Sequence, residues 1–371
     1  MNDAAMGRIM ELIEKVKEAA NSKKNKDKGK SKPFIAVGIE HPIGWVELFG
    51  YDIDLYFNDP YFYIEQTLLQ NLWQFENIED DTSIVAGINA WLGYYTEYTF
   101  FGMNVKYNKK GVPIIQEDHP LTNDPDLSLL KPVDFLSSGW MQRALKWNEE
   151  INRILKDRLF VGFIIWNRGC LDLAIQLRGY DNLMTDIVER PEFVHDLLKF
   201  ITRERIRWWD SYYKYFNKDI SPTQIGDDWL NIPFITPQFF DEFVLPCYLD
   251  MERYHGGIEY LHSCGNQTPI QKSLLKIKSL DTLEVSPWSD LTQSLHNIPE
   301  EKHLQINLHP NDVLYEDKKE IEKKLRFIAD SCEGRKYSIA TSGLTPNPKD
   351  DLGFAERIKI WTDIAKKVFD K

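Results

Sequence analysis

The stretch PTQIGDDWLNIPFITPQFFDEFVLPCYLDMERYHGGIEYLHSCGN, residues 222–266, contains one complete strand–helix–strand unit. Runs of β-forming residues at 222–228 and 257–263 predict two strands. Between them, Thr236 can cap the first turn of a helix, and Pro237 suits the first helical position. A strand, a helix and a second strand in this order are typical of parallel strands joined by a helical crossover. The unit therefore favours an α/β fold.

The same alternation continues along most of the chain. Similar β-rich runs predict eight strands, at 34–39, 83–89, 159–165, 222–228, 257–263, 280–286, 303–308 and 336–342. Helical spacing of apolar residues lies between the later runs, and one such helix should begin at Asp317 and end near Gly334. Eight regular β/α units fit a closed (β/α)8 TIM barrel better than an open sheet.

Two segments depart from this alternation. Residues 1–32 combine an amphipathic helix pattern with the lysine-rich run KKNKDKGKSK, which we interpret as a flexible linker. We therefore expect an N-terminal helical extension over 1–32 and the barrel over 33–371. The residues 98–117 predict a β-hairpin that turns near Asn108–Gly111 and is inserted into the second β/α unit.

Composition excludes several classes of function. The net charge of −12 argues against nucleic acid or an anionic membrane as the main partner. No apolar run approaches the roughly 20 residues that a membrane span needs, and the first helix does not have the pattern of a signal peptide. The four cysteines, Cys170, Cys247, Cys264 and Cys332, lie too far apart to suggest a disulfide scaffold. We expect a soluble cytoplasmic protein.

Polar and ionisable residues gather where the predicted strands end. In a barrel of this kind the chemistry lies at the carboxyl-terminal ends of the strands. The residues found there are Glu40, His41, Trp166, Asn167, Arg168, Asp227, Asp228, His262, Cys264, Glu284, Asn307, His309, Thr341 and Ser342. The predicted mouth of the barrel is therefore the candidate site.

A metal site is the sharpest hypothesis at this mouth. His262 and Cys264 are two residues apart on a strand, so their side chains point to the same side. Imidazole and thiolate are zinc ligands, and a catalytic zinc has three protein ligands and an open position. Glu284 ends the next predicted strand and can supply the third ligand. The alternative is that the histidine and cysteine are ordinary packing residues.

The pair Asp227–Asp228 suggests acid–base catalysis or substrate binding. The alternative is that one of the two caps the following turn. Trp229 beside them can form an aromatic wall, and Arg168 can hold a substrate carboxylate or cover a helix end.

Three segments resemble the uroporphyrinogen decarboxylase superfamily: PEFVHDLLKFI, IGDDWLNIPFITPQFFDEFVLPCY and YLHSCGN. The resemblance extends over roughly residues 33–368 and implies a (β/α)8 barrel. The decarboxylase proper carries an arginine-rich segment near its amino terminus that holds the substrate carboxylates. Here the equivalent segment, FIAVGIEHPIGWVELFG, contains no arginine. We therefore expect no uroporphyrinogen decarboxylase activity.

Other members of this superfamily are zinc methyltransferases that work with corrinoid proteins. Their ligands are a histidine and a cysteine two residues apart, matched by His262 and Cys264, and a later cysteine, where this chain has Ser342. The chain is also similar to cobalamin-independent methionine synthase, whose zinc site adds a glutamate that Glu284 matches. The resemblance implies Zn²⁺ at His262, Cys264 and Glu284, and in place of the missing cysteine either an open position or a weak contact with Ser342.

The leading hypothesis is a zinc-dependent methyltransferase. It would move a methyl group from a small O-methyl substrate, such as an aryl methyl ether, to a corrinoid carried by a partner protein. The residues expected to act are Asp227 and Asp228 in catalysis, and Trp166, Arg168, Trp229 and Ser342 in substrate binding. Two alternatives stay open: a metal-free decarboxylase of a small or tetrapyrrole carboxylate, and a barrel that binds a ligand without turnover.

Overall fold

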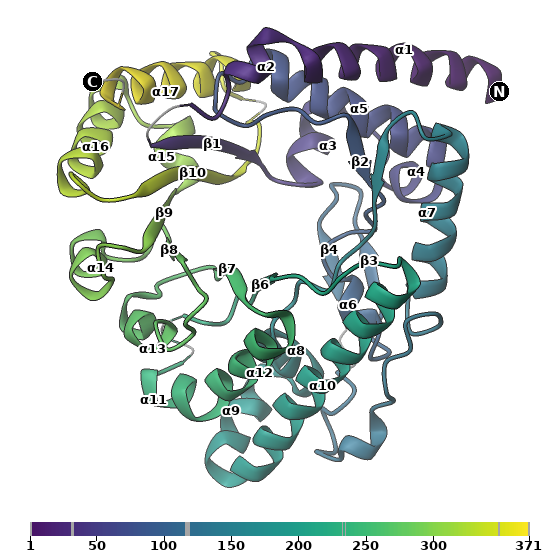
Figure 1. Cartoon of the computed structure of the whole chain (residues 1–371), viewed down its shortest axis with the longest axis vertical. Coiled ribbons are helices and arrows are strands. Elements are labelled where there is room, and N and C mark those ends of the chain that lie inside the picture. Colours follow the sequence, from purple (N-terminus) through teal and green to yellow (C-terminus); the bar gives the residue numbers. More distant parts are fainter. Residues whose placement is uncertain are drawn as a thin grey trace.

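The computed structural model describes residues 2–30, 33–115, 119–231, 233, 235–347 and 349–369. Strands form a ring at the centre of the molecule and helices surround it (Figure 1). Each of the eight predicted strands is present. The ring contains β1 (Phe34–Ile39), β2 (Gly87–Asn89), β5 (Phe160–Gly162), β6 (Thr223–Gly226), β7 (Ile258–His262), β8 (Thr282–Val285), β9 (His303–Leu308) and β10 (Tyr337–Leu344). The predicted (β/α)8 TIM barrel is confirmed.

The strands of the ring pair in parallel. Six of them are hydrogen-bonded in the order β1-β10-β9-β8-β7-β6, and β2 pairs with β5. A bridge between Arg168 and Gly226 connects the segment after β5 to β6. On the side of β1 that faces the loop before β2, side chains replace a neighbouring strand. The carboxylates of Asp81 and Asp80 accept the backbone N–H groups of Ile35 at 2.8 Å and Val37 at 2.9 Å. These contacts satisfy backbone groups that a buried edge would otherwise leave unpaired.

The helices follow the strands as the punctuation of the sequence predicts. Thr236 accepts a hydrogen bond from the backbone N–H of Phe239, and Asp317 caps the helix that starts at Lys318. The larger helices are α1 (Asn2–Asn21), α3 (Ile43–Phe49), α4 (Ile53–Asn58), α5 (Pro60–Asn77), α7 (Met141–Leu155), α8 (Cys170–Arg178), α9 (Tyr180–Glu189), α10 (Pro191–Tyr215), α12 (Leu245–His255), α14 (Leu291–Asn297), α16 (Lys318–Ser331) and α17 (Phe354–Phe369). Shorter ones are α2 (Lys23–Asp27), α6 (Thr96–Thr99), α11 (Pro237–Phe239), α13 (Gln271–Leu274) and α15 (Pro310–Leu314).

The N-terminal extension packs on the barrel. Helix α1 lies along α5 (Figure 1) and buries Ile9, Ile13 and Val16. The lysine-rich run, expected to be flexible, forms α2 over part of its length. The ammonium of Lys28 then lies 3.2 Å from the carboxylate of Asp80, with both side chains almost buried. Residues 31 and 32 of this run lie outside the described residues.

The predicted hairpin is also present. Its strands, β3 (Val105–Tyr107) and β4 (Pro113–Ile115), pair in antiparallel register. The side chain of Asn108 accepts the backbone N–H groups of Lys110 and Val112 and so shapes the turn. Residues 116–118, at the end of the predicted hairpin, lie outside the described residues.

The inner side of the barrel is polar along β7, β8 and β9. Residues alternate along a strand, so one set packs under the helices and the other faces the barrel axis. Leu261, Leu283 and Leu304 belong to the buried apolar set. Tyr260, His262, Glu284, Gln305 and Asn307 belong to the inner set, in which Gln305 donates to the hydroxyl of Tyr260 at 2.8 Å. This polar interior leads to the carboxyl-terminal ends of the strands.

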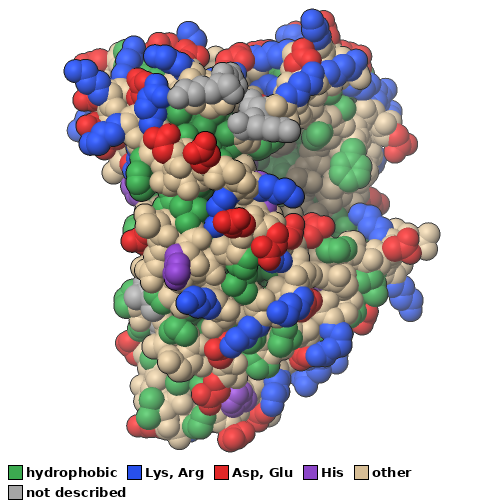
Figure 2. All heavy atoms as spheres, turned by 60° about the vertical axis from the view of Figure 1, so that its left-hand side comes forward, with side chains coloured by type: hydrophobic (Ala, Val, Ile, Leu, Met, Phe, Trp, Pro, Cys, Tyr) green, Lys and Arg blue, Asp and Glu red, His purple; other side chains and the backbone are tan. Residues whose placement is uncertain are grey.

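The outer surface carries charge of both signs. Lys and Arg side chains alternate with Asp and Glu side chains over the face in Figure 2. In the described ranges, every helix is too short or too polar to cross a membrane.

Candidate metal centre

Three donor groups meet at the ends of β6 and β7. His262 is the last residue of β7, Cys264 lies just beyond it, and Asp228 follows the end of β6. Nε2 of His262 lies 3.4 Å from Sγ of Cys264 and 3.7 Å from Oδ1 of Asp228. The third side of the triangle, from Sγ of Cys264 to Oδ1 of Asp228, is 3.6 Å. Among the described residues, these three form the cluster that can hold a metal ion.

The dimensions of this triangle fit zinc. Bonds of about 2.0–2.3 Å to a tetrahedral zinc place neighbouring donor atoms about 3.3–3.7 Å apart. The three distances between the donor atoms agree with this range. One imidazole, one thiolate and one carboxylate also make a donor set that zinc accepts in catalytic sites, where a fourth position stays open.

Glu284 lies on the other side of the His262 ring. Its Oε2 is 2.7 Å from Nδ1 of His262 and also accepts the hydroxyl of Tyr260 at 2.5 Å. A carboxylate at this place fixes the ring and presents the opposite nitrogen to a metal. Glu284 was predicted to be the third ligand, but in the structure Asp228 completes the donor triangle and Glu284 orients the histidine.

The same contacts determine the protonation of His262 in the metal-free site. Burial lowers the pKa of His262, but the hydrogen bonds to Cys264 and Glu284 outweigh it and raise this pKa to about 11. A metal ion at Nε2 would take the place of that proton.

Arg168 fixes the orientation of Asp228. Its Nη1 lies 2.5 Å from Oδ2 of Asp228 and 2.8 Å from Oδ2 of Asp172. The guanidinium also lies over the rings of Tyr95 and Tyr98, at 5.3 and 5.9 Å from their centroids. Burial opposes ionisation of Asp228, yet the charge of Arg168 lowers its pKa below the ordinary value. Arg168, predicted to bind substrate, thus bridges two carboxylates, and Oδ1 of Asp228 stays directed at His262 and Cys264.

Asp227 and Trp166 lie behind the site. Asp227 is fully buried and accepts the backbone N–H groups of Leu171 at 3.0 Å and Asp172 at 2.9 Å, and the hydroxyl of Tyr248 at 2.7 Å. It therefore anchors the first turn of α8, which precedes it in the sequence. The predicted alternative to catalysis was a cap on the turn that follows the aspartates, so this contact was not among the expectations. Trp166, predicted to bind substrate, is also fully buried and donates to the carbonyl of Arg168.

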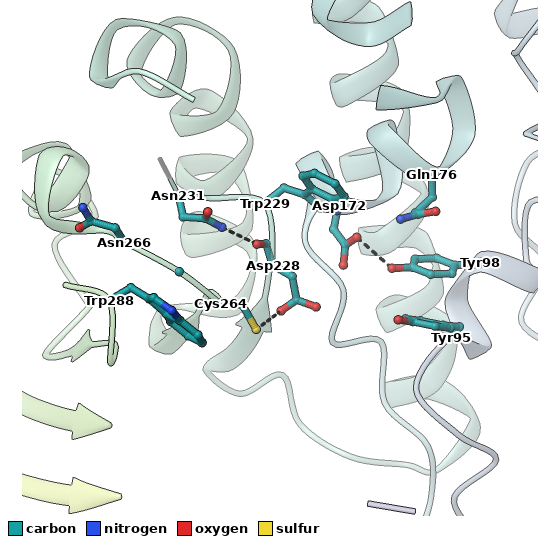
Figure 3. A pocket seen from close by; sticks show the side chains of 11 residues that line it. Tyr95, Tyr98, Asp172, Gln176, Asp228, Trp229, Asn231, Cys264, Asn266 and Trp288 are labelled. Atoms are coloured by element: carbon teal, nitrogen blue, oxygen red, sulfur yellow. Dashed lines mark hydrogen bonds between the residues drawn. The ribbon is translucent and has the colours of Figure 1, made fainter. Parts of the chain in front are cut away.

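A cavity of about 560 Å³ opens beside the donor triangle. Asp228 and Cys264 lie in its wall, with Trp288 on one side and Tyr95 and Tyr98 on the other (Figure 3). Trp229, predicted as an aromatic wall, lines the cavity and stacks on Tyr180, with 5.4 Å between the two ring centroids. The remaining lining residues are polar or glycine: Asp172, Gln176, Asn231, Gly265 and Asn266. Ser342 lies on β10, and its side chain is outside the described residues.

Asp172 and Gln176 were not identified from the sequence. They lie one helical turn apart on α8, and Asp172 lies one turn after Arg168. Residues four apart share a helix face. The spacing Arg168–Asp172–Gln176 could therefore have indicated a shared polar face. Recognising that face required knowing that the segment is helical and that α8 begins at Cys170.

A family model and a solved methyltransferase structure agree with the fold of this chain. A family model described as uroporphyrinogen decarboxylase (URO-D) matches residues 91–352. No curated protein sequence matches the chain. Among solved structures, a methyltransferase from Methanosarcina mazei aligns with a TM-score of 0.65 and 15% identity, over 96% of this chain and 98% of that one. A putative vitamin-B12 independent methionine synthase from Listeria monocytogenes aligns with a TM-score of 0.35 and 11% identity, over 66% and 73% of the two chains.

Proposed function

This chain belongs to the uroporphyrinogen decarboxylase (URO-D) family, and we propose that within it the protein is a zinc-dependent methyltransferase. The substrate would be a small O-methyl compound, such as an aryl methyl ether. The acceptor of the methyl group would be a corrinoid carried by a partner protein. The donor triangle of Asp228, His262 and Cys264 at the wall of an aromatic cavity carries this proposal. The fold shared with a methyltransferase supports it.

Asp228, His262 and Cys264 would hold the zinc. When bound, zinc supplies a Lewis acid that stabilises negative charge on the heteroatom from which the methyl group departs. Glu284 keeps the imidazole of His262 in the binding orientation, and Arg168 does the same for the carboxylate of Asp228. Both supports are buried or nearly so, which keeps the donor atoms in place before a metal binds.

The aromatic lining suits a flat substrate. Tyr95, Tyr98, Trp229 and Trp288 can contact a ring, while the amides of Gln176 and Asn231 can bind its polar substituents. The cavity is open to solvent beside Trp288, whose side chain is largely exposed. The corrinoid is too large to be enclosed by such a cavity and would have to approach from this opening.

The metal-free decarboxylase is less well supported by the cavity. A substrate with several carboxylates needs cationic partners in the wall. The described lining contains two carboxylates, Asp172 and Asp228, and the guanidinium of Arg168 behind them is engaged by both. The third hypothesis, a barrel that binds a ligand without turnover, is distinguished from the enzyme by an activity assay.

The test combines metal analysis with methyl transfer. Protein purified without chelator should contain about one zinc per chain and should form methylcobalamin from cob(I)alamin, or methylate a corrinoid protein. The methyl donors to compare are aryl methyl ethers, methanol and methylamines. His262→Ala and Cys264→Ala should lose zinc and activity together, whereas His296→Ala, at an exposed position on α14, should keep both. A zinc content near zero that Cys264→Ala does not change would contradict the proposal and favour the decarboxylase.

A further inference from the structure

Glu40 lies at the same mouth as the metal ligands and takes no part in the site described so far. It directly follows β1, and its backbone N–H donates to the carbonyl of Leu344 at 3.0 Å. By strand alternation it shares a face with Ala36 and Gly38, opposite the buried residues Ile35 and Val37. The carboxylate is thus directed to the inner side of the barrel.

A bulge in β10 makes room for this carboxylate. Val37 pairs with Thr341 and Ile39 pairs with Leu344, so β10 has one residue more than β1 over this stretch. Gly343, in the bulge, has a φ of 71°, and a Cβ atom on it would lie 3.3 Å from Oε2 of Glu40. The carboxylate therefore packs against a backbone position without a side chain.

Within the described part of the chain, the carboxylate of Glu40 has no hydrogen-bond or ion-pair partner, although its residue is half-buried. A buried acid without partners favours its neutral form. Burial, and after it the negative charge of Asp228, raise the pKa of Glu40. The pKa of Tyr94, in the loop after β2, is raised by burial and then by the charge of Glu40. Glu40 therefore belongs to the same electrostatic environment as the donor triangle.

The other acids of the mouth are engaged. Asp228 is paired with Arg168, Asp172 with Arg168 and Tyr98, Glu284 with His262 and Tyr260, and Asp227 with Tyr248 and two backbone N–H groups of α8. These contacts hold each carboxylate in one orientation and stabilise its charge. Glu40 is the described acid at this mouth that keeps a proton available without breaking such a contact.

We propose that Glu40 is the proton donor to the oxygen from which the methyl group leaves. This inference rests on the proposed function. The bond between the methyl carbon and the oxygen breaks with its electron pair on the oxygen. The methyl carbon forms its new bond with an electron pair of the reduced corrinoid on the partner protein. The proton of Glu40 forms the O–H bond of the product, and the Glu40 carboxylate then regains a proton from water.

The test uses the leaving group. Glu40→Gln should slow transfer from methanol, or from the methyl ether of an unsubstituted phenol, by about 100-fold or more. It should change transfer from a nitro-substituted aryl methyl ether far less, because that phenolate leaves without a proton. Glu259→Gln, an exposed position on the outer side of β7, is the matched control and should behave as wild type. An equal loss with every donor, or no loss, would overturn the inference.

A second measurement does not depend on turnover. In protein labelled with ¹³C at the glutamate carboxyls, the NMR signal of Glu40 is the one that is missing from the spectrum of Glu40→Gln. This signal should give a pKa above the usual glutamate value of about 4.3. The same signal should titrate lower in Asp228→Asn, because the neighbouring charge is removed. Titration at the usual value would overturn the inference. If wild type accepts methyl groups from none of the donors, the proposed function fails and this inference with it. If wild type is active but lacks the leaving-group effect, the inference alone fails.

Discussion

The carboxylate of Glu284 lies 2.7 Å from Nδ1 of His262. Because a carboxylate can only accept, Nδ1 must donate, and Nε2 is left to face Cys264 and Asp228. The strand register produces this arrangement. Tyr260 pairs with Thr282 and Gly226 pairs with His262, so two residues further on each strand Glu284 comes beside His262 and Asp228 beside Cys264.

The first prediction separates the two carboxylates. Glu284→Gln should weaken zinc binding by about 10- to 100-fold, the usual effect of losing a partner of a metal-bound histidine. Asp228→Asn should weaken it more, because an amide is a much poorer zinc ligand than a carboxylate. Competition with a chromophoric chelator measures both affinities, and Glu259→Gln, on the outer side of β7, is the control. Intact binding in Asp228→Asn with loss in Glu284→Gln would show that Glu284 is the ligand after all.

The barrel could be predicted from the sequence because each of its strands and helices is marked by a pattern of neighbouring residues. Each strand is a short β-rich run, and each helix has its own caps, as at Thr236 and Asp317. The contacts that escaped prediction join distant segments. The order of the lysine-rich run depends on Lys28 meeting Asp80, and the edge of β1 depends on Asp80 and Asp81.

The site shows the same limit. His262 and Cys264 could be placed together because two residues on one strand share a face. Asp228 and Glu284 come from the neighbouring strands, so their roles depend on register, which no local pattern of this chain determines. For the same reason the sequence could not decide between Asp227 and Asp228. In the structure Asp227 caps α8, and Asp228 faces the cavity.

The second prediction concerns the stability that Arg168 provides. Arg168→Met should reduce the free energy of unfolding of the metal-free protein by about 3–5 kcal/mol, because it leaves Asp172 and Asp228 without a counter-charge. Burial raises the pKa of Asp172 to about 6. The charge of Arg168 lowers this pKa, so in Arg168→Met it lies higher still. Asp172 of the variant therefore takes up a proton before the pH falls to about 6 and no longer needs a counter-charge, so the loss should be smaller at pH 5 than at pH 8. Urea unfolding at both values measures it.

Arg253→Met is the control for Arg168. It removes an ion pair with Asp250 that is exposed on both sides, and such pairs contribute about 0–1 kcal/mol. A loss in Arg168→Met that is no larger than in this control would show that the buried bridge has no stabilising role.

The third prediction concerns the aromatic wall. Trp288→Ala should raise KM for an aryl methyl ether by about 2- to 12-fold, which corresponds to the about 0.5–1.5 kcal/mol of a contact between two rings. Its KM for methanol should not change, because methanol has no ring to lose. Tyr315→Ala removes another exposed ring, away from this cavity, and should leave both values unchanged. A parallel rise for both substrates would mean that Trp288 shapes the site instead of contacting a ring.

The fourth prediction is that uroporphyrinogen is not decarboxylated. The segment from Phe34 to Gly50 contains no arginine, and Arg168 is held by two carboxylates. The substrate carboxylates would therefore meet Asp172 and Asp228 without a cationic partner in the described lining of the cavity. Anaerobic incubation followed by chromatography should detect no coproporphyrinogen, and its appearance would refute the prediction.

The last prediction concerns Ser342, where the superfamily resemblance places a cysteine ligand in related methyltransferases. Ser342 lies on β10, in the stretch where that strand has an extra residue relative to β1. If Asp228 already completes the set of three protein ligands, a thiolate introduced by Ser342→Cys would compete for the position that the substrate needs. Zinc should then bind more tightly, and methyl transfer from an ether oxygen should become slower, because a further thiolate makes zinc a weaker Lewis acid. Ser342→Ala should keep the zinc and change activity modestly. Chelator competition and methylcobalamin formation, measured on the same preparations, test both expectations. Faster transfer in Ser342→Cys would mean that the native site lacks a third ligand, and that Asp228 does not serve as one.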